Sequence, residues 1–359
     1  AAITSPNDIS WSDPILPQVA DAAWEAEVKR AMGNVPDFML RVTPSPWMRR
    51  FVMNTHSYRY MHLSPRHADI CFLVTSQENA CRYCYGAARA MMRLLGYSDA
   101  FTTQIEREAQ LAELDERERA FIQFSRNLAR SNPRPGRMAR EQLMALGYSK
   151  EVVTEMAFMI ALNCMGNRIT TLMACRPEFA LERFSTSWLA RLLRPIIKRQ
   201  MRRMPPEYTS NGAGGARTLF PVAALLDSVP KAAALLQDTL DDAFASTVIP
   251  RSTKALMFGV VARALECEFC ESNVSRMLES AGFTAAEVDS ALSTLSSPRL
   301  DANGQALISW VRDTVRYQPS EVQRRTRTLL AQVGPEQALE AIGVAALANG
   351  VVRLAMLHP

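Results

Sequence analysis

Four cysteines stand in two pairs whose spacing suits thiol–disulfide chemistry. Cys81 and Cys84 form one C-x-x-C motif, and Cys267 and Cys270 form a second. Two intervening residues let one sulfur reach the other, so the pair can close into a disulfide and reopen by thiol exchange. Where such a motif begins a helix, the first-turn amides stabilise a thiolate and lower its pKa. The sequence therefore indicates a redox-active dithiol in each half of the chain.

The two motifs belong to a longer internal repeat. Cys267 follows Cys81 by 186 residues, and each pair precedes a similar run, MMRLLGY in the first half and MLESAGF in the second. The same spacing recurs at two further places, which are Leu114-Asp115 with Leu300-Asp301, and Asn163 with Asn349. We therefore expect a tandem duplication of one folding unit.

Composition and patterning predict an all-α fold. The chain has 359 residues, 48% of them apolar, which is enough to bury two ordinary domain cores. No window alternates apolar and polar residues with a period of two, so little or no sheet is expected. The net charge is +5, and it is concentrated in residues 181–204, where seven basic residues face one acidic residue. Such a localised charge does not fit a general nucleic-acid binder.

Breaks in the pattern divide the chain into four parts. An extended Pro- and Ser-rich arm (1–20) precedes a first helical domain (21–180), a linker (181–217) and a second helical domain (218–359). Within the domains, helices are expected to begin at Ser64-Pro65 and Pro250-Arg251 and to lead to the dithiols. Long apolar helices over 151–173 and 338–356 should form the core.

The linker combines a basic amphipathic segment with a Gly-rich stretch. Residues 187–204 read as such a segment, broken at Pro195, and Thr209–Ala216 is the Gly-rich part. Two interpretations stay open: the segment docks on an anionic surface or acidic partner, or it is a solvated connector. A homo-oligomer is compatible with either.

The remaining cysteines and the histidines give no sign of a cofactor. Cys71, Cys164 and Cys175 lie in apolar runs and read as core residues. The chain has four histidines, too few for a histidine-rich metal site, and 182 residues separate the two cysteine pairs, far beyond the spacing of a zinc ribbon. A shared zinc is therefore the weaker alternative to two dithiols. No signal-peptide pattern and no membrane-spanning apolar stretch are recognised, so a cytoplasmic location is expected, although the Ala1-Ala2 start leaves a removed export signal open.

The sequence resembles the carboxymuconolactone decarboxylase and alkyl hydroperoxidase D-like superfamily. The second half carries the resemblance best, in the run RSTKALMFGVVARALECEFC over 251–270. The first half carries it from Pro65-Arg66 through the dithiol to the LLGYS run over 94–98. The resemblance implies two tandem helical domains, related by a pseudo-twofold axis, that imitate the dimer of single-unit relatives. It also implies an antiparallel pair of core helices.

For the site, the resemblance implies that Cys84 attacks and Cys81 resolves, with Cys270 and Cys267 as counterparts. An acid is expected twelve residues before the first cysteine, where Asp69 stands in the first half and Ala255 in the second. Histidines expected before and four residues after the second cysteine are absent from both halves, where the positions hold Tyr83, Ala88, Phe269 and Val274.

This loss matters because peroxide reduction needs a proton for the departing oxygen, a step worth two to four orders of magnitude in rate. Candidate substitutes are found only near the first dithiol, at His67, Glu78 and Tyr83, so activity is expected there. Each also has a plain structural interpretation, as a capping, surface or packing residue.

Two functions of different classes follow. The first is a thiol-dependent oxidoreductase that acts on a peroxide, a disulfide or a specialised small molecule, with no cofactor beyond the disulfide and with an external thiol reductant. The second is a catalytically degenerate helical scaffold that docks through the basic linker. A third, lactone ring-opening as in the other branch of the superfamily, fits less well because that branch generally lacks the dithiol.

Overall fold

The computed structural model describes residues 3–108, 111, 114–132, 134–135, 137–201 and 220–357. Every regular element within these residues is a helix, which confirms the all-α prediction. Thr209–Ala216 and the basic residues Arg202 and Arg203 lie outside the described residues.

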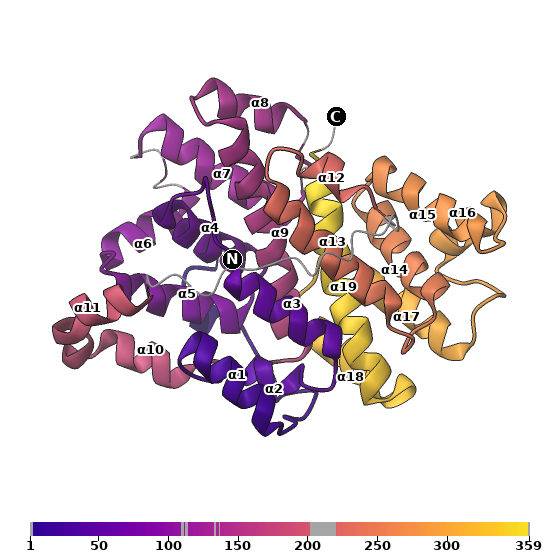
Figure 1. Ribbon diagram of the computed structural model, residues 1–359, viewed down its shortest axis with the longest axis horizontal. Helices are drawn as coiled ribbons and strands as arrows, with labels where there is room; N and C mark the ends of the chain where they lie inside the picture. Colours follow the sequence, from indigo (N-terminus) through magenta and orange to yellow (C-terminus); the bar gives the residue numbers. More distant parts are fainter. Residues whose placement is uncertain are drawn as a thin grey trace.

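Two long helices lie side by side at the centre of the molecule, α9 (Lys150–Leu172) and α19 (Pro335–Ala355) (Figure 1). Their close approach depends on Gly350, where an added Cβ would lie 2.5 Å from Cγ of Met165 and 2.8 Å from the Ala161 carbonyl oxygen. By length and composition α19 could span a membrane, which the sequence analysis did not recognise, but it is wholly buried in the protein core.

The helices around this pair follow the same order on both sides. In the first half, α4 (Pro65–Glu78) packs against α5 (Arg82–Leu95), α7 (Glu116–Arg130) and α9. In the second half, α14 (Arg251–Ala264) packs against α15 (Glu268–Ser280), α17 (Ala302–Asp313) and α19. The remaining helices of the two series are α6 (Asp99–Glu106) and α8 (Arg137–Ala145), and α16 (Ala285–Thr294) and α18 (Pro319–Val333).

Buried charges occupy matching places on the two core helices. Glu155 and Glu340 are both the sixth residue of their helix, and both are buried. Arg168 and Arg353 are likewise buried near the two C-terminal ends, and both donate to the backbone carbonyl of Val315, at 2.9 and 3.0 Å. Because an unpaired buried charge is costly, these hydrogen bonds fix the register of the two helices.

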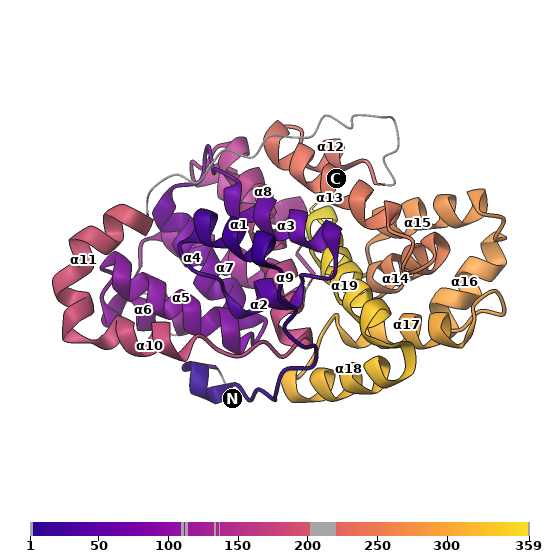
Figure 2. The ribbon, with the colours of Figure 1, turned by 60° about the horizontal axis from the view of Figure 1, so that its bottom comes forward.

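The outer helices connect the two halves. The first half begins with α1 (Ala22–Met32), α2 (Asp37–Arg41) and α3 (Pro46–Ser57), and α3 packs against α13 (Pro230–Ala245), which follows α12 (Val222–Leu225). The N-terminal arm is not extended throughout, since Pro6–Asp8 form a 3₁₀ helix, η1. The arm crosses from α5 to α18 and so bridges both halves (Figure 2).

The first part of the linker is helical and docked. It forms α10 (Phe179–Thr186) and α11 (Trp188–Met201), and both helices pack on α5. The expected break at Pro195 is wrong, because α11 continues through this residue. The predicted domain boundary at residue 180 falls inside α10.

Candidate dithiol site

The same backbone turn presents both dithiols. At the end of α4, the amide groups of Asn79, Ala80 and Cys81 donate to the carbonyls of Thr75, Gln77 and Ser76, and Ala80 adopts a left-handed φ of 47°. At the end of α14, the amides of Leu265, Glu266 and Cys267 donate to Val261, Arg263 and Ala262, and Glu266 has a φ of 55°. Each turn places the first cysteine at the N-cap of the next helix, as the sequence predicted. The helix-start position of both motifs is therefore confirmed.

One threonine hydroxyl joins the two sulfurs of the first pair. Oγ1 of Thr170, on α9, lies 3.1 Å from Sγ of Cys81 and 3.2 Å from Sγ of Cys84. The amide of Cys84 also donates to Sγ of Cys81, at 3.2 Å. The hydroxyl has a single proton and also lies 3.0 Å from the Gly166 carbonyl. A thiolate is a stronger hydrogen-bond acceptor than a carbonyl oxygen, so the Thr170 hydroxyl donates its hydrogen bond to Cys81 when Cys81 is ionised.

The electrostatics separate the roles of the two sulfurs. Burial acts to raise the pKa of Cys81, but the hydrogen bonds from Cys84 and Thr170 outweigh it and bring the pKa to about 7. Burial and the adjacent Cys81 sulfur hold the pKa of Cys84 well above its ordinary value. As pH rises above about 7, the pair therefore comes to hold one proton, on Cys84. Cys81 is fully buried, whereas Cys84 keeps 6% of its surface exposed.

Two tyrosines from different parts of the chain line this site. The Tyr83 hydroxyl donates to Glu178 at 2.9 Å, and burial followed by the Glu178 charge raises its pKa well above the ordinary value. The Tyr317 hydroxyl donates to the Asn79 carbonyl at 2.9 Å. Burial raises the Tyr317 pKa to about 12, and the Cys81 charge adds to the shift. Because Tyr317 belongs to the second half, the first dithiol site is composite.

The second dithiol has a poorer polar environment. Cys267 and Cys270 are both buried, and within the described residues no hydroxyl side chain is hydrogen-bonded to either sulfur. The interaction with Cys270 lowers the pKa of Cys267, and the Arg134 charge contributes. Arg134 comes from the first half and donates to the Glu266 carbonyl. Thr170 stands two residues after Arg168 in α9. The residue at the same place after Arg353 in α19 is Ala355, which has no hydroxyl.

The supporting residues named from the sequence are placed elsewhere. The Tyr97 hydroxyl donates to Asp69 at 2.8 Å, just past the end of α5 that is opposite the dithiol. Because α5 has 14 residues, its two ends are about 20 Å apart. His67 stacks on Phe121 with 4.3 Å between ring centroids. Glu78 forms ion pairs with Arg126 and Arg130 of α7. Of these candidates, only Tyr83 is brought beside the dithiol.

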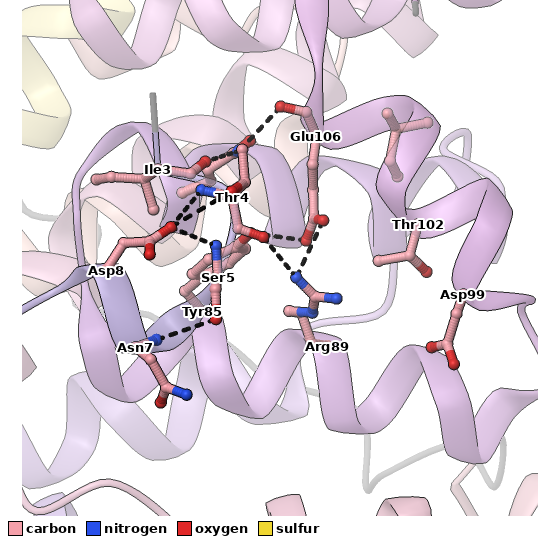
Figure 3. Close-up of polar contacts among 12 residues, drawn as sticks. Ile3, Thr4, Ser5, Asn7, Asp8, Tyr85, Arg89, Asp99, Thr102 and Glu106 are labelled. Atoms are coloured by element: carbon pink, nitrogen blue, oxygen red, sulfur yellow. Dashed lines mark hydrogen bonds and ion pairs between the residues drawn. The ribbon is translucent and has the colours of Figure 1, made fainter. Parts of the chain in front are cut away.

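The N-terminal arm covers this side of the molecule and is fastened at both ends. Near its start, Arg89 donates to the Thr4 carbonyl at 2.9 Å and to Glu106 at 3.1 Å, while the Tyr85 hydroxyl donates to Glu106 at 2.8 Å (Figure 3). Further along, the Ile15 amide donates to the Met173 carbonyl at 2.9 Å, at the C-terminal end of α9. The arm therefore lies over the helix end that carries Thr170.

An open cleft of about 800 Å³ lies between the arm and helices α2 and α10, lined by Trp11, Asp13, Pro14, Ile15, Leu16, Pro17, Gln18, Asp37, Arg41, Arg176 and Phe179. Tyr83 connects its wall to the dithiol, because Glu178 accepts from the Tyr83 hydroxyl and also from the Asp37 amide, at 3.4 Å. Behind the wall is Cys175, a third buried thiol whose pKa is raised by burial and by the Asp37 charge. The cleft gives the dithiol a nearby surface of mixed apolar and charged side chains.

Sequence reasoning missed Thr170 and Tyr317. A signal for Thr170 was present, because Asn167, Thr170 and Thr171 put polar groups at helical spacing in a helix that is otherwise largely apolar. Nothing local marks Tyr317, which reaches the dithiol only through the packing of the two halves.

No metal-binding cluster of histidine, cysteine or carboxylate side chains occurs among the residues that the structure describes. The chain matches no protein-family model, no curated protein and no solved structure.

Proposed function

We propose that the protein is a dithiol oxidoreductase in which Cys84 and Cys81 exchange electrons with a disulfide. The observation that carries the proposal is the shared hydroxyl of Thr170, 3.1 and 3.2 Å from the two sulfurs, together with the opposite pKa shifts of the pair. As pH rises above about 7, the Cys81 sulfur is ionised and the Cys84 sulfur stays protonated, and the Thr170 hydroxyl provides a proton path between them. Structural cysteines buried in an apolar core have raised pKa values instead, as Cys71 does, at about 12.

The chemistry begins at Cys84, the less deeply buried residue of the pair. As Cys84 attacks one sulfur of the substrate disulfide, its proton moves through Thr170 to the Cys81 thiolate. The first substrate sulfur leaves as a thiolate, and Cys84 is held in a mixed disulfide. Cys81 then attacks Cys84, and its proton goes to the second substrate sulfur, which leaves as a thiol. Two electrons reduce one disulfide, and the Cys81–Cys84 disulfide is later opened by an external thiol reductant.

In this scheme Cys81 is the base that the missing histidines would otherwise supply. The scheme favours a disulfide over a peroxide as substrate. A thiolate leaves without protonation, because thiol pKa values are near 8.5, whereas an alkoxide or hydroxide needs an acid. The Tyr83 hydroxyl is the nearest candidate acid, and it is engaged by Glu178.

The architecture supports the resemblance to the hydroperoxidase D-like superfamily. Three observations support a tandem duplication with pseudo-twofold symmetry. The helices follow the same order in both halves, and the same backbone turn precedes each dithiol. In addition, Glu155 and Arg168 of α9 correspond to Glu340 and Arg353 of α19. In this proposal the first half is the active one, because Thr170 has no hydroxyl-bearing counterpart in the second. The second dithiol is then a degenerate copy that keeps the shape of the turn.

Trapping of the mixed disulfide tests the proposal. Cys81→Ser is incubated with an aryl disulfide reporter at pH 9, where hydroxide replaces the missing Cys81 base, and is analysed by intact-mass spectrometry. We expect one reporter group to accumulate on Cys84. Cys84→Ser should trap far less, since Cys81 is enclosed. The double variant Cys267→Ser/Cys270→Ser is the matched control and should behave as wild type. Trapping on Cys81 alone would reverse the two roles, and trapping on neither cysteine would refute the proposal.

The scaffold function remains the second candidate because all seven cysteines are buried, and because α11 presents an outward basic and apolar face. A scaffold function predicts that the thiols do not cycle between reduced and oxidised forms. It also predicts that Cys84→Ser still binds the docking partner of the basic linker.

A further inference from the structure

Helix α11 has three faces of different chemistry. Its inner face packs on α5 and α10 and contains the buried Ala190 and the half-buried Leu193 and Ile197. Its outer face carries three large apolar side chains at intervals of four residues. Trp188, Leu192 and Ile196 are 74%, 68% and 64% exposed, so they form one stripe along the helix.

A cationic flank accompanies the apolar stripe. Arg191 and Lys198 are exposed beside it, and Arg199 lies in line with Trp188 and Leu192. Within the described part of the chain, none of these three cations forms an ion pair with a carboxylate. In water an apolar stripe of this size is unfavourable, and exposed apolar patches usually mark interaction sites.

The position of α11 suits a planar partner. The helix lies at the outer edge of the molecule in both ribbon views (Figures 1 and 2). The high exposure of Trp188, Leu192 and Ile196 shows that the apolar stripe is open to an approaching surface. Helices that rest in a lipid interface combine Trp and Leu on one face with Lys and Arg on the adjoining face. An acidic protein would match the cations, but the separate outward stripe of Trp188, Leu192 and Ile196 fits the acyl boundary of a bilayer.

We infer that α11 is an interfacial anchor that holds the protein on an anionic membrane surface. The apolar stripe enters the region between headgroups and acyl chains, and the cations contact lipid phosphates and carboxylates. The inference is independent of the dithiol chemistry, because none of the residues involved contacts the cysteine pairs.

Vesicle flotation of the full chain tests this inference. With phosphatidylcholine vesicles containing about one third phosphatidylserine, we expect the protein to float at low salt and to be released as salt rises. Vesicles of phosphatidylcholine alone should bind it weakly. Subtracting the fluorescence emission spectrum of Trp188→Phe from that of the wild type isolates the Trp188 signal. This emission should shift to shorter wavelength when vesicles bind, which reports entry of the side chain into the membrane interface.

Two triple variants separate the contributions. Arg191→Gln/Lys198→Gln/Arg199→Gln should lower the partition coefficient about a hundredfold, since each cation near the surface contributes about fivefold. Trp188→Ser/Leu192→Ser/Ile196→Ser should abolish flotation at every salt concentration. All these side chains are exposed, and unchanged circular dichroism and thermal midpoints verify folding.

Matched controls carry the same chemical changes elsewhere. Met61→Ser/Met138→Ser removes apolar side chains that are 61% and 62% exposed, and Lys29→Gln/Arg30→Gln removes exposed cations from α1. Both should bind vesicles nearly as wild type does. Failure of the wild type to float with anionic vesicles at low salt would overturn the inference. Equal flotation of the apolar triple variant, or a Trp188-dependent dimer without vesicle binding, would overturn it as well.

Discussion

The hydroxyl of Thr170 should set the acidity of the first dithiol, and Thr170→Val removes it at nearly constant volume. A hydrogen bond to a charged group contributes about 1.5–3 kcal/mol, and about 1.4 kcal/mol corresponds to one pKa unit. Because Cys81 is fully buried, little of this effect is lost to solvent. The variant should therefore raise the Cys81 pKa from about 7 to about 8–9.

The assay is the thiolate absorbance at 240 nm as a function of pH, with Cys267→Ser/Cys270→Ser as background. The signal grows as pH rises through the pKa, so the wild-type midpoint should lie near neutrality and the Thr170→Val midpoint higher. Thr170→Ser keeps the hydroxyl and should restore most of the difference. Thr75→Val is the control, because this buried hydroxyl has no hydrogen-bond partner among the described residues. Equal midpoints in wild type and Thr170→Val would refute the assigned role.

Three further substitutions test the packing that holds the site. Gly350→Ala should lower the free energy of unfolding by about 1–3 kcal/mol because of overpacking against α9. Gly166→Ala is the control and should not destabilise the protein, because no atom lies within 4 Å of an added Cβ. Thermal unfolding measures both variants. Glu155→Gln should lower the free energy of unfolding by about 2–3 kcal/mol in denaturant unfolding. Its carboxylate accepts hydrogen bonds from Tyr58 and from the Met61, His62 and Leu63 amides, and Glu336→Gln, at an exposed position of α19, serves as control. Lys254→Met leaves Glu340 buried without its cation and should lower the free energy of unfolding by about 3–5 kcal/mol. The double variant Lys254→Met/Glu340→Leu should recover most of this loss in denaturant unfolding. A double variant that is no more stable than Lys254→Met would contradict the pairing.

Local sequence signals predicted the helices well. Ser64 caps α4 by accepting from the His67 amide, and Gly96 ends α5 in a left-handed conformation, as expected from their types. The two long apolar helices were placed within a few residues of α9 and α19. These signals act over one or two turns, so a single sequence contains them.

Contacts between distant segments were harder to predict. The break expected at Pro195 does not occur, because packing of α11 on α5 supports the helix through this residue. Tyr317 reaches Asn79 across 238 residues, and no local pattern encodes such a contact. Asp69 was placed from the resemblance alone, and its hydrogen bond to Tyr97 holds it at the other end of α5.

The redox equilibrium of the first cysteine pair tests the account most directly. The protein is equilibrated in glutathione buffers of graded ratio, quenched with acid, alkylated and mapped by mass spectrometry, with Cys71 and Cys164 as internal controls. The account predicts reversible closure of Cys81–Cys84 with a midpoint between about −180 and −300 mV, the range of working thiol oxidoreductases, while the controls stay reduced. A pair that remains reduced in every buffer, or that closes and cannot be reopened, would contradict a cycling dithiol.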